Sequence, residues 1–333
     1  MRYLVSALVL AASAARAEAP VVLKLGTLAP QGSTWHEILK EMGQRWSQVS
    51  GGAVTLRIYP GGVQGNEGDM IRKLGIGQLQ AAALSNVGMH DITPEPKGLS
   101  IPLFFAGEAE AECGFEAVRP ALEEAIAKRG YAVVHWSRLG ALYLYCSEPR
   151  RTPADMATAR FFAQEGDPRA AEGWRAAGFR PVQLSATDLY PALQTGMVDC
   201  VPSLPIYVLT ARLFEKARHM ADLPWGYMYG ATVVRRDAWE RIAADVRPRL
   251  LEVAHETGAK ADAEVRRLNE DALAAMKRQG LSVVAVDAAP WRAAMEKGYA
   301  FLRGDVVPAP FFDAISAARD ACRAGGPHAP PGR

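Results

Sequence analysis

The residues of this sequence that could do chemistry are concentrated in the run PVQLSATDLYPALQTGMVDCVPS, which spans Pro181–Ser203. Ser185 and Asp188 have the Ser-x-x-Asp spacing in which a hydroxyl caps a helix and a carboxylate interacts with its free N–H groups. Residues 197–201 are predicted to form a buried strand after that helix. In such strand–helix–strand units, ligands bind beyond the carboxyl ends of strands, close to helix N-termini. We therefore expect a site here, the alternative being a unit that only packs.

Catalytic chemistry finds little support elsewhere in the chain. The sequence has no Gly-x-Ser-x-Gly elbow, no phosphate loop and no His-Glu-x-x-His, and Gly75-Ile-Gly77 lacks the third glycine of a dinucleotide fingerprint. None of the six histidines lies three or four residues from another, which argues against a helical metal pair. Asp199 and Cys200 could form a catalytic pair, but an acid at a strand end near a helix dipole is the simpler interpretation. We predict no catalytic residue, no metal and no cofactor.

The N-terminus predicts export. Arg2 gives a positively charged start, residues 4–12 are apolar, and Ala15-Arg16-Ala17 matches an A-x-A cleavage site. This pattern is typical of a secretory signal peptide cleaved after Ala17, and no later stretch approaches the ~20 apolar residues of a membrane helix. The prediction is a periplasmic protein without direct membrane insertion.

Composition limits the partners and the architecture. Cleavage would remove two arginines and no acid, so the formal charge would fall from +2 to zero, which argues against nucleic acid as a partner. The remaining length exceeds the ~250–300 residues of a usual single core, which favours two lobes. Four cysteines allow up to two disulfides in an oxidising compartment, and the sequence leaves open how they pair. Cys200 is also compatible with a small buried hydrophobe.

The elements expected to position the site alternate strand and helix. The N-terminal part predicts strands at 21–26, 53–59 and 80–84, with a helix capped by Ser33 between the first two, which is typical of a mostly parallel sheet with helices on both faces. Tyr131–Trp136 and Ala141–Cys146 are predicted as two further strands, with a crossing between lobes near 139–142.

One element is unusually long. Apolar or small residues recur every three or four positions from about 247 to 279, which predicts a single helix. At ~1.5 Å per residue this helix would be about 50 Å long. A lobe of this protein would be only ~30–35 Å across, so the helix must lie along both lobes.

The order of several motifs resembles the DctP-type solute-binding subunits of TRAP (tripartite ATP-independent periplasmic) transporters. The resemblance covers essentially the whole mature chain, and its most specific part is Leu193-Gln-Thr-Gly-Met-Val-Asp199. The other matching motifs are Leu25-Gly-Thr27, Ser50-Gly-Gly52 with Leu56-Arg-Ile-Tyr-Pro60, Ile101-Pro-Leu-Phe-Phe105 and Asp155-Met156. The resemblance implies an α/β, type II-like, two-lobe periplasmic binding protein. It would have open mixed sheets with helices on both faces and one long helix spanning both lobes. It also implies a small-molecule ligand and delivery to TRAP membrane subunits.

The departures from the family pattern concern the ligand. The family arginine that grips a substrate carboxylate corresponds to Phe162, and Glu-Asn after the Gly-x-x-Asp run corresponds to Pro202-Ser203. The strand that usually supplies another arginine has the sequence ALYLYC. These departures resemble the TatP subgroup, whose binding protein works with a tetratricopeptide-repeat partner and is thought to favour apolar ligands. The alternatives are an ordinary organic-acid binder using Arg160, Arg138 or Arg180, and an exported enzyme on the same scaffold.

We expect the ligand to be held by residues from both lobes: Trp35, Asn86, Phe105, Tyr145, Phe162, Ser203, Tyr207 and Trp225. Trp35, Tyr145 and Tyr207 could instead belong to the lobe cores. The predicted boundaries are 1–17 for the signal peptide, 20–140 with 226–260 for lobe I, 141–225 with 261–322 for lobe II, and 323–333 for a disordered tail.

Overall fold

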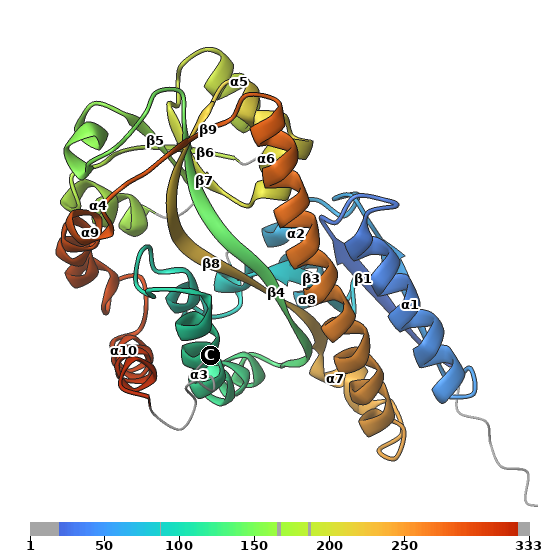
Figure 1. Cartoon of the computed structure of the whole chain (residues 1–333). Helices are drawn as coiled ribbons and strands as arrows, with labels where there is room; N and C mark the ends of the chain where they lie inside the picture. The colour runs from blue at the N-terminus through green and yellow to red at the C-terminus, as the bar shows by residue number, and fades with distance from the viewer. Residues whose placement is uncertain (1–19, 87, 165–167, 186–187, 326–333) are drawn as a thin grey trace, which may run out of the picture.

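The computed structural model describes residues 20–86, 88–164, 168–185 and 188–325. The predicted signal peptide and residues 326–333 of the predicted tail lie outside these ranges. The described residues contain one nine-stranded mixed sheet, in the order β2-β1-β3-β8-β4-β7-β5-β6, with β9 pairing to β8 (Figure 1). The strands are β1 Val21–Thr27, β2 Val54–Tyr59, β3 Ala81–Ser85, β4 Tyr131–Cys146, β5 Arg160–Gln164, β6 Arg180–Leu184, β7 Cys200–Ser203, β8 His219–Arg235 and β9 Ser282–Val284.

The helices lie on both faces of this sheet. They are α1 Thr34–Val49, α2 Glu67–Gly75, α3 Glu108–Lys128, α4 Pro168–Ala176, α5 Leu189–Gln194, α6 Pro205–Thr210, α7 Arg236–Glu240, α8 Arg247–Arg278, α9 Ala288–Leu302 and α10 Ala309–Arg323. Short 3₁₀ turns occur at η1 Gly88–Asp91, η2 Glu95–Ser100, η3 Pro153–Ala157 and η5 Leu213–Glu215. The predicted cap of α1 is confirmed, because the Ser33 side chain accepts a hydrogen bond from the His36 N–H.

Two long antiparallel strands, β4 and β8, run through the whole molecule and join its two halves (Figure 1). The prediction of separate strands at 131–136 and 141–146 was wrong, because β4 continues from Tyr131 to Cys146. The region predicted as the crossing is nevertheless irregular: the β4–β8 register shifts between Arg138 and Gly140, and again around Tyr143. Gly140 has φ +106°, a conformation that side chains other than glycine rarely adopt. The backbone thus bends within the strand without interrupting it.

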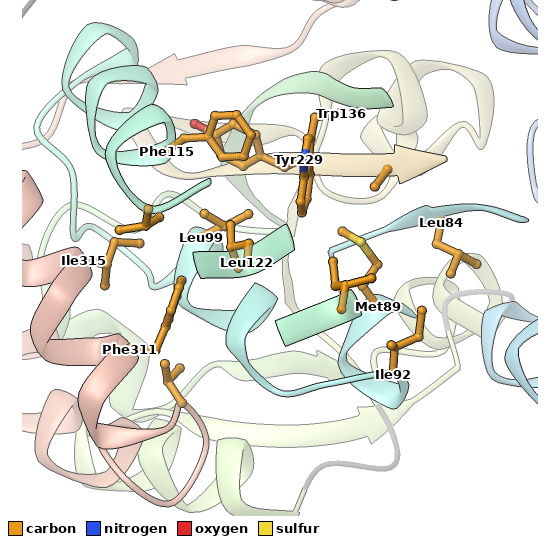
Figure 2. Packing of buried hydrophobic residues seen from close by; sticks show 14 of the residues in the cluster. Leu84, Met89, Ile92, Leu99, Phe115, Leu122, Trp136, Tyr229, Phe311 and Ile315 are labelled. Atoms are coloured by element: carbon orange, nitrogen blue, oxygen red, sulfur yellow. The ribbon is translucent and has the colours of Figure 1, made fainter. Parts of the chain in front are cut away.

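Strand pairing defines the two halves. On one side of the shifts, β8 pairs with β3, and β1 and β2 extend the sheet. On the other side, β4 pairs with β7, and β5 and β6 extend the sheet. Each half has its own buried apolar clusters. The first half contains the cluster around Phe115 and Tyr229, whose rings stack at 4.8 Å, as Figure 2 shows. These halves have the arrangement expected of lobes I and II, and we use those names for them. The predicted residue boundaries of the lobes stay a prediction.

The predicted long helix is confirmed within one residue, as α8 spans Arg247–Arg278. It packs against α1 in lobe I, against β4, and against α6 in lobe II (Figure 1). Its buried face includes Leu250, Thr257, Val265 and Met276, members of the stripe that predicted it. The helix therefore lies along both lobes, as predicted.

Helix α5 is described from Leu189, with Asp188 in the N-cap position and Pro191 in its first turn, where a proline is tolerated. Residues 186–187 lie outside the described ranges, so the prediction that Ser185 caps this helix stays a prediction.

Two disulfides join the four cysteines. Cys146 pairs with Cys200 across β4 and β7, and Cys113 of α3 pairs with Cys322 of α10. The first bond lies within lobe II, and the second fastens the last helix of the described chain to lobe I.

Candidate ligand site

The strand directions place the carboxyl ends of both lobes' parallel strands toward the junction of the lobes. In lobe I, Ser85 at the end of β3 pairs with Gly230, the β3 partner in β8 that lies nearest to lobe II. In lobe II, Ser203 at the end of β7 pairs with Tyr143, the β7 partner in β4 that lies nearest to lobe I. Because β1 runs parallel to β3, and β5 parallel to β6 and β7, their ends share these two rims. The N-termini of α1, α2, α5 and α6 follow such ends, which is where α/β sheets bind ligands.

Asn86 fixes the lobe I rim to β8. Its side chain is fully buried, its Nδ2 donates to Ser100 Oγ at 2.7 Å, and its backbone N donates to the Tyr229 carbonyl at 2.9 Å. The bond to Tyr229 holds the end of β3 against strand β8. Asn86 therefore positions the rim through its internal partners, and its predicted contact with ligand stays a prediction.

Glu67, the first residue of α2, is a rim residue that the sequence reasoning missed. Its carboxylate accepts hydrogen bonds from the Ser85 N–H at 2.5 Å and the Ser85 hydroxyl at 2.7 Å. Burial raises the pKa of Glu67, the bonds from Ser85 oppose that rise, and the nearby Asp91 carboxylate adds to it. An acid in the first turn of a helix that follows a strand is the sequence signal that could have identified it.

The lobe II rim is aromatic and apolar. Phe162 is half-buried on the face of β5 that packs against the cluster around Tyr145 and Val201. Tyr143, Val182, Leu184 and Tyr190 are also only partly buried on that cluster. Ser203 is 8% exposed at the end of β7, and Tyr207 of α6 is 39% exposed. The structure thus brings Phe162, Ser203 and Tyr207 to the same lobe, with surface remaining to contact a ligand.

The other predicted aromatic residues differ in burial. Trp35, in the first turn of α1, is half-buried, and its indole N–H has no hydrogen-bond partner among the described residues. Phe105, Tyr145 and Trp225 are core residues that are at most 4% exposed. Trp225 stacks on Trp174, with ring centroids 6.0 Å apart, and Phe105 packs in the lobe I cluster. Trp35 lies in the first turn of α1, at the lobe I rim, and its contact with a ligand stays a prediction, as does that of the three buried rings.

The three arginines considered as substitutes for the family arginine are placed elsewhere. Arg160 and Arg180 are register partners at the amino ends of β5 and β6, the ends away from the rim. Arg160 forms two side-chain hydrogen bonds with the Asp199 carboxylate, of 2.8 and 2.9 Å. Burial opposes ionisation of Asp199, but the bonds from Arg160 outweigh it and lower the pKa of Asp199. Both charges of this pair are therefore already matched.

Arg138 is the third candidate, and it is held in an ion cluster between α3 and α8. Its guanidinium donates to Glu112 at 2.6 Å, Glu116 at 2.8 Å and Asp262 at 3.1 Å. Three carboxylates leave this arginine no free face for a substrate carboxylate. Within the described ranges, no group of three metal-ligating side chains was found, and no helix is long and apolar enough to cross a membrane.

Comparison with known proteins identifies the family. The model of the DctP family, described as bacterial extracellular solute-binding protein, family 7, matches residues 25–304. The chain belongs to this family. It is 27% identical over 305 residues to the C4-dicarboxylate-binding periplasmic protein DctP of Rhodobacter capsulatus, covering 88% of each chain. It is also 20% identical to the sialic acid-binding periplasmic protein SiaP of Vibrio cholerae, covering 86% of this chain and 90% of that protein.

Solved structures share the two-lobe fold. A TRAP periplasmic solute-binding protein of Chromohalobacter salexigens with bound D-glucuronate superposes with a TM-score of 0.82 at 18% identity, covering 90% of this chain and 99% of that one. One from Desulfovibrio salexigens with bound orotic acid gives 0.80 at 20% identity, covering 90% and 98%. The predicted fold class, an α/β two-lobe binding protein with a mixed sheet, is confirmed. The family consists of solute-binding proteins, not enzymes.

Proposed function

We propose that this DctP-family protein binds an apolar or amphipathic small molecule between its lobes in the periplasm and delivers it to TRAP membrane subunits. The observation that carries the ligand class is the lobe II rim. Phe162 occupies the position that the family resemblance assigns to a carboxylate-gripping arginine, and the arginines that could replace it are paired or lie at the far ends of their strands.

The energetics favour the same class. An ionised carboxylate transferred into a closed site loses several kcal/mol of hydration unless a cation pairs with it. Phe162 offers no charge, whereas covering its ring with an apolar group contributes up to roughly 1.5–3 kcal/mol. The Trp35 N–H, which has no hydrogen-bond partner among the described residues, could serve a polar end of the ligand. An amphipathic molecule with its apolar end on lobe II suits this arrangement.

An organic-acid ligand is the second candidate. Relatives and structural neighbours are described as binding C4-dicarboxylates, glucuronate and orotate, which favours this candidate mildly. Their low identities leave room for a change of ligand class.

The test is native mass spectrometry of the exported protein as purified, followed by solvent extraction of whatever it carries. We expect an added mass that partitions into the organic phase and is lost after unfolding and refolding. Recovery of a small dicarboxylate or uronate instead would contradict the proposed ligand class.

We also propose a periplasmic tetratricopeptide-repeat protein as a partner, because the sequence resembles the TatP subgroup. Affinity purification of the tagged protein from its own cells should enrich such a protein together with TRAP subunits. Enrichment of TRAP subunits alone would place the protein among the ordinary TRAP binding proteins.

A further inference from the structure

The last two helices of the described residues form a third connection between the lobes, besides strands β4 and β8 and helix α8. Helix α9 lies against α4 of lobe II, while α10 lies against α3 of lobe I (Figure 1). We call the six residues 303–308 between them the strap.

Helix α9 is held by lobe II along most of its length. Trp291 is buried in the lobe II cluster, and its ring meets that of Trp225 edge-on at 5.9 Å. Gly298 approaches α4 so closely that a Cβ on it would be 3.1 Å from the Gly173 carbonyl oxygen. At the C-terminal end of α9, Tyr299 reaches lobe I and donates a hydrogen bond to the Pro102 carbonyl at 2.8 Å. The helix therefore ends at the boundary between the lobes.

Helix α10 is held by lobe I. Phe311, Phe312 and Ile315 belong to the lobe I cluster, and the guanidinium of Arg319 lies over the Phe104 ring at 4.1 Å. The disulfide uses Cys322, the penultimate residue of α10. The C-terminal end of a terminal helix unfolds most readily, so the disulfide stabilises the part of α10 that packing alone stabilises least.

The strap is short and is held on lobe I. Val307 is 1% exposed in the lobe I cluster, and its N–H bonds to the Leu302 carbonyl at 2.8 Å. Arg303 forms a bidentate ion pair with Asp313 of α10. Only four residues separate Leu302 from Val307, a span of at most ~17 Å even when fully extended. Separation of α9 from lobe I beyond that span requires Val307 and then α10 to leave α3.

We propose that the Cys113–Cys322 disulfide, by fastening α10 to α3, anchors the strap and limits how far the two lobes open. The proposal rests on the hinge motion that the proposed function assumes. The disulfide prevents α10 from peeling away, which is the step that would lengthen the connection. A narrower range of open states lowers the entropy lost on closure and so favours ligand capture.

The experiment measures distances between the lobes of the ligand-free protein by double electron–electron resonance spectroscopy. Spin labels are carried by unnatural amino acids at Ile76 of lobe I and Met197 of lobe II, which are 71% and 51% exposed. The test variant is Cys113→Ala/Cys322→Ala. The matched control is Cys146→Ala/Cys200→Ala, which removes the disulfide inside lobe II. Hydrogen exchange of residues 309–323 is followed in both.

We expect the test variant to broaden the distance distribution toward longer values and to accelerate exchange in α10 on the order of 10²-fold, while the control does neither. Faster exchange with an unchanged distance distribution would overturn the proposal, because the disulfide would then stabilise α10 locally without limiting the opening of the lobes. Equal broadening in the control would overturn it as well.

A second variant covers the case in which the first does not fold. Insertion of three glycines between Gly304 and Asp305, with both disulfides intact, should extend the distribution by up to ~10 Å. An unchanged distribution in this variant would overturn the proposal. No ligand is used, so failure here is distinguishable from failure of the proposed ligand class, which the extraction experiment decides.

Discussion

Replacement of Phe162 by arginine should convert the lobe II rim into a carboxylate site. The Phe162 ring is half-buried on the lobe II cluster, so its removal forfeits about half of the 1.5–3 kcal/mol of a fully buried ring. The aliphatic stem of the arginine recovers part of that contact while its guanidinium turns toward the rim. We expect a net destabilisation of about 1 kcal/mol and a melting temperature lower by a few degrees.

Added D-glucuronate should then stabilise Phe162→Arg but not the wild type. At a concentration ten times the variant's Kd, the gain is about 1.4 kcal/mol, enough for a measurable rise in melting temperature by scanning fluorimetry. Phe162→Lys is the matched control, because it supplies a cation without the planar fork that binds a carboxylate bidentately. An equal rise in the wild type would refute the reasoning, since a carboxylate would then bind without this arginine.

Three further predictions concern the framework of the site. Burial against Gly258, together with the neighbouring His255 and Arg138, lowers the pKa of His135 to about 4. The free energy of unfolding should therefore fall by up to ~3 kcal/mol between pH 6.5 and 4, as His135 becomes protonated on unfolding. Urea unfolding of His135→Gln should show a flatter pH dependence. Gly140→Ala should lower the free energy of unfolding by more than Gly130→Ala: both glycines have positive φ, but only at Gly140 would a Cβ meet a side chain, that of Asn269 at 2.9 Å. Asn86→Ala should cost about 1–3 kcal/mol, and more than Ser100→Ala, which keeps the bond that the Tyr229 N–H donates to Asn86 Oδ1 at 3.4 Å; equal losses would show that the bond to Ser100 alone matters.

Local patterns predicted the regular elements of this chain well. The three- and four-residue spacing of small and apolar residues located α8, because a long amphipathic stripe has no competing interpretation. The same local reasoning divided β4 into two strands with a crossing near 139–142, because the pairing with β8 that carries the strand through Gly140 joins distant segments.

The site was harder to predict because it depends on contacts between distant segments. The prediction that Phe162 contacts the ligand rests on the family resemblance and stays a prediction, whereas Trp225 meets Trp174 and Trp291 through tertiary packing that no spacing reveals. The disulfide between Cys113 and Cys322 spans 209 residues and likewise depends on where α10 docks. Glu67 was missed because its role depends on Ser85, which reaches it only when β3 and α2 are adjacent.

Calorimetric titration of the ligand-free wild type with small organic acids tests the central claim most directly. The panel contains C3 to C6 mono- and dicarboxylates together with D-glucuronate, and the protein is first unfolded and refolded to remove any bound molecule. Because Phe162 carries no charge, Arg138 and Arg160 are ion-paired and Arg180 lies at the amino end of β6, the expected result is binding in the millimolar range or none. Micromolar binding of any acid in the panel would contradict the account and place the protein among the organic-acid binders of its family.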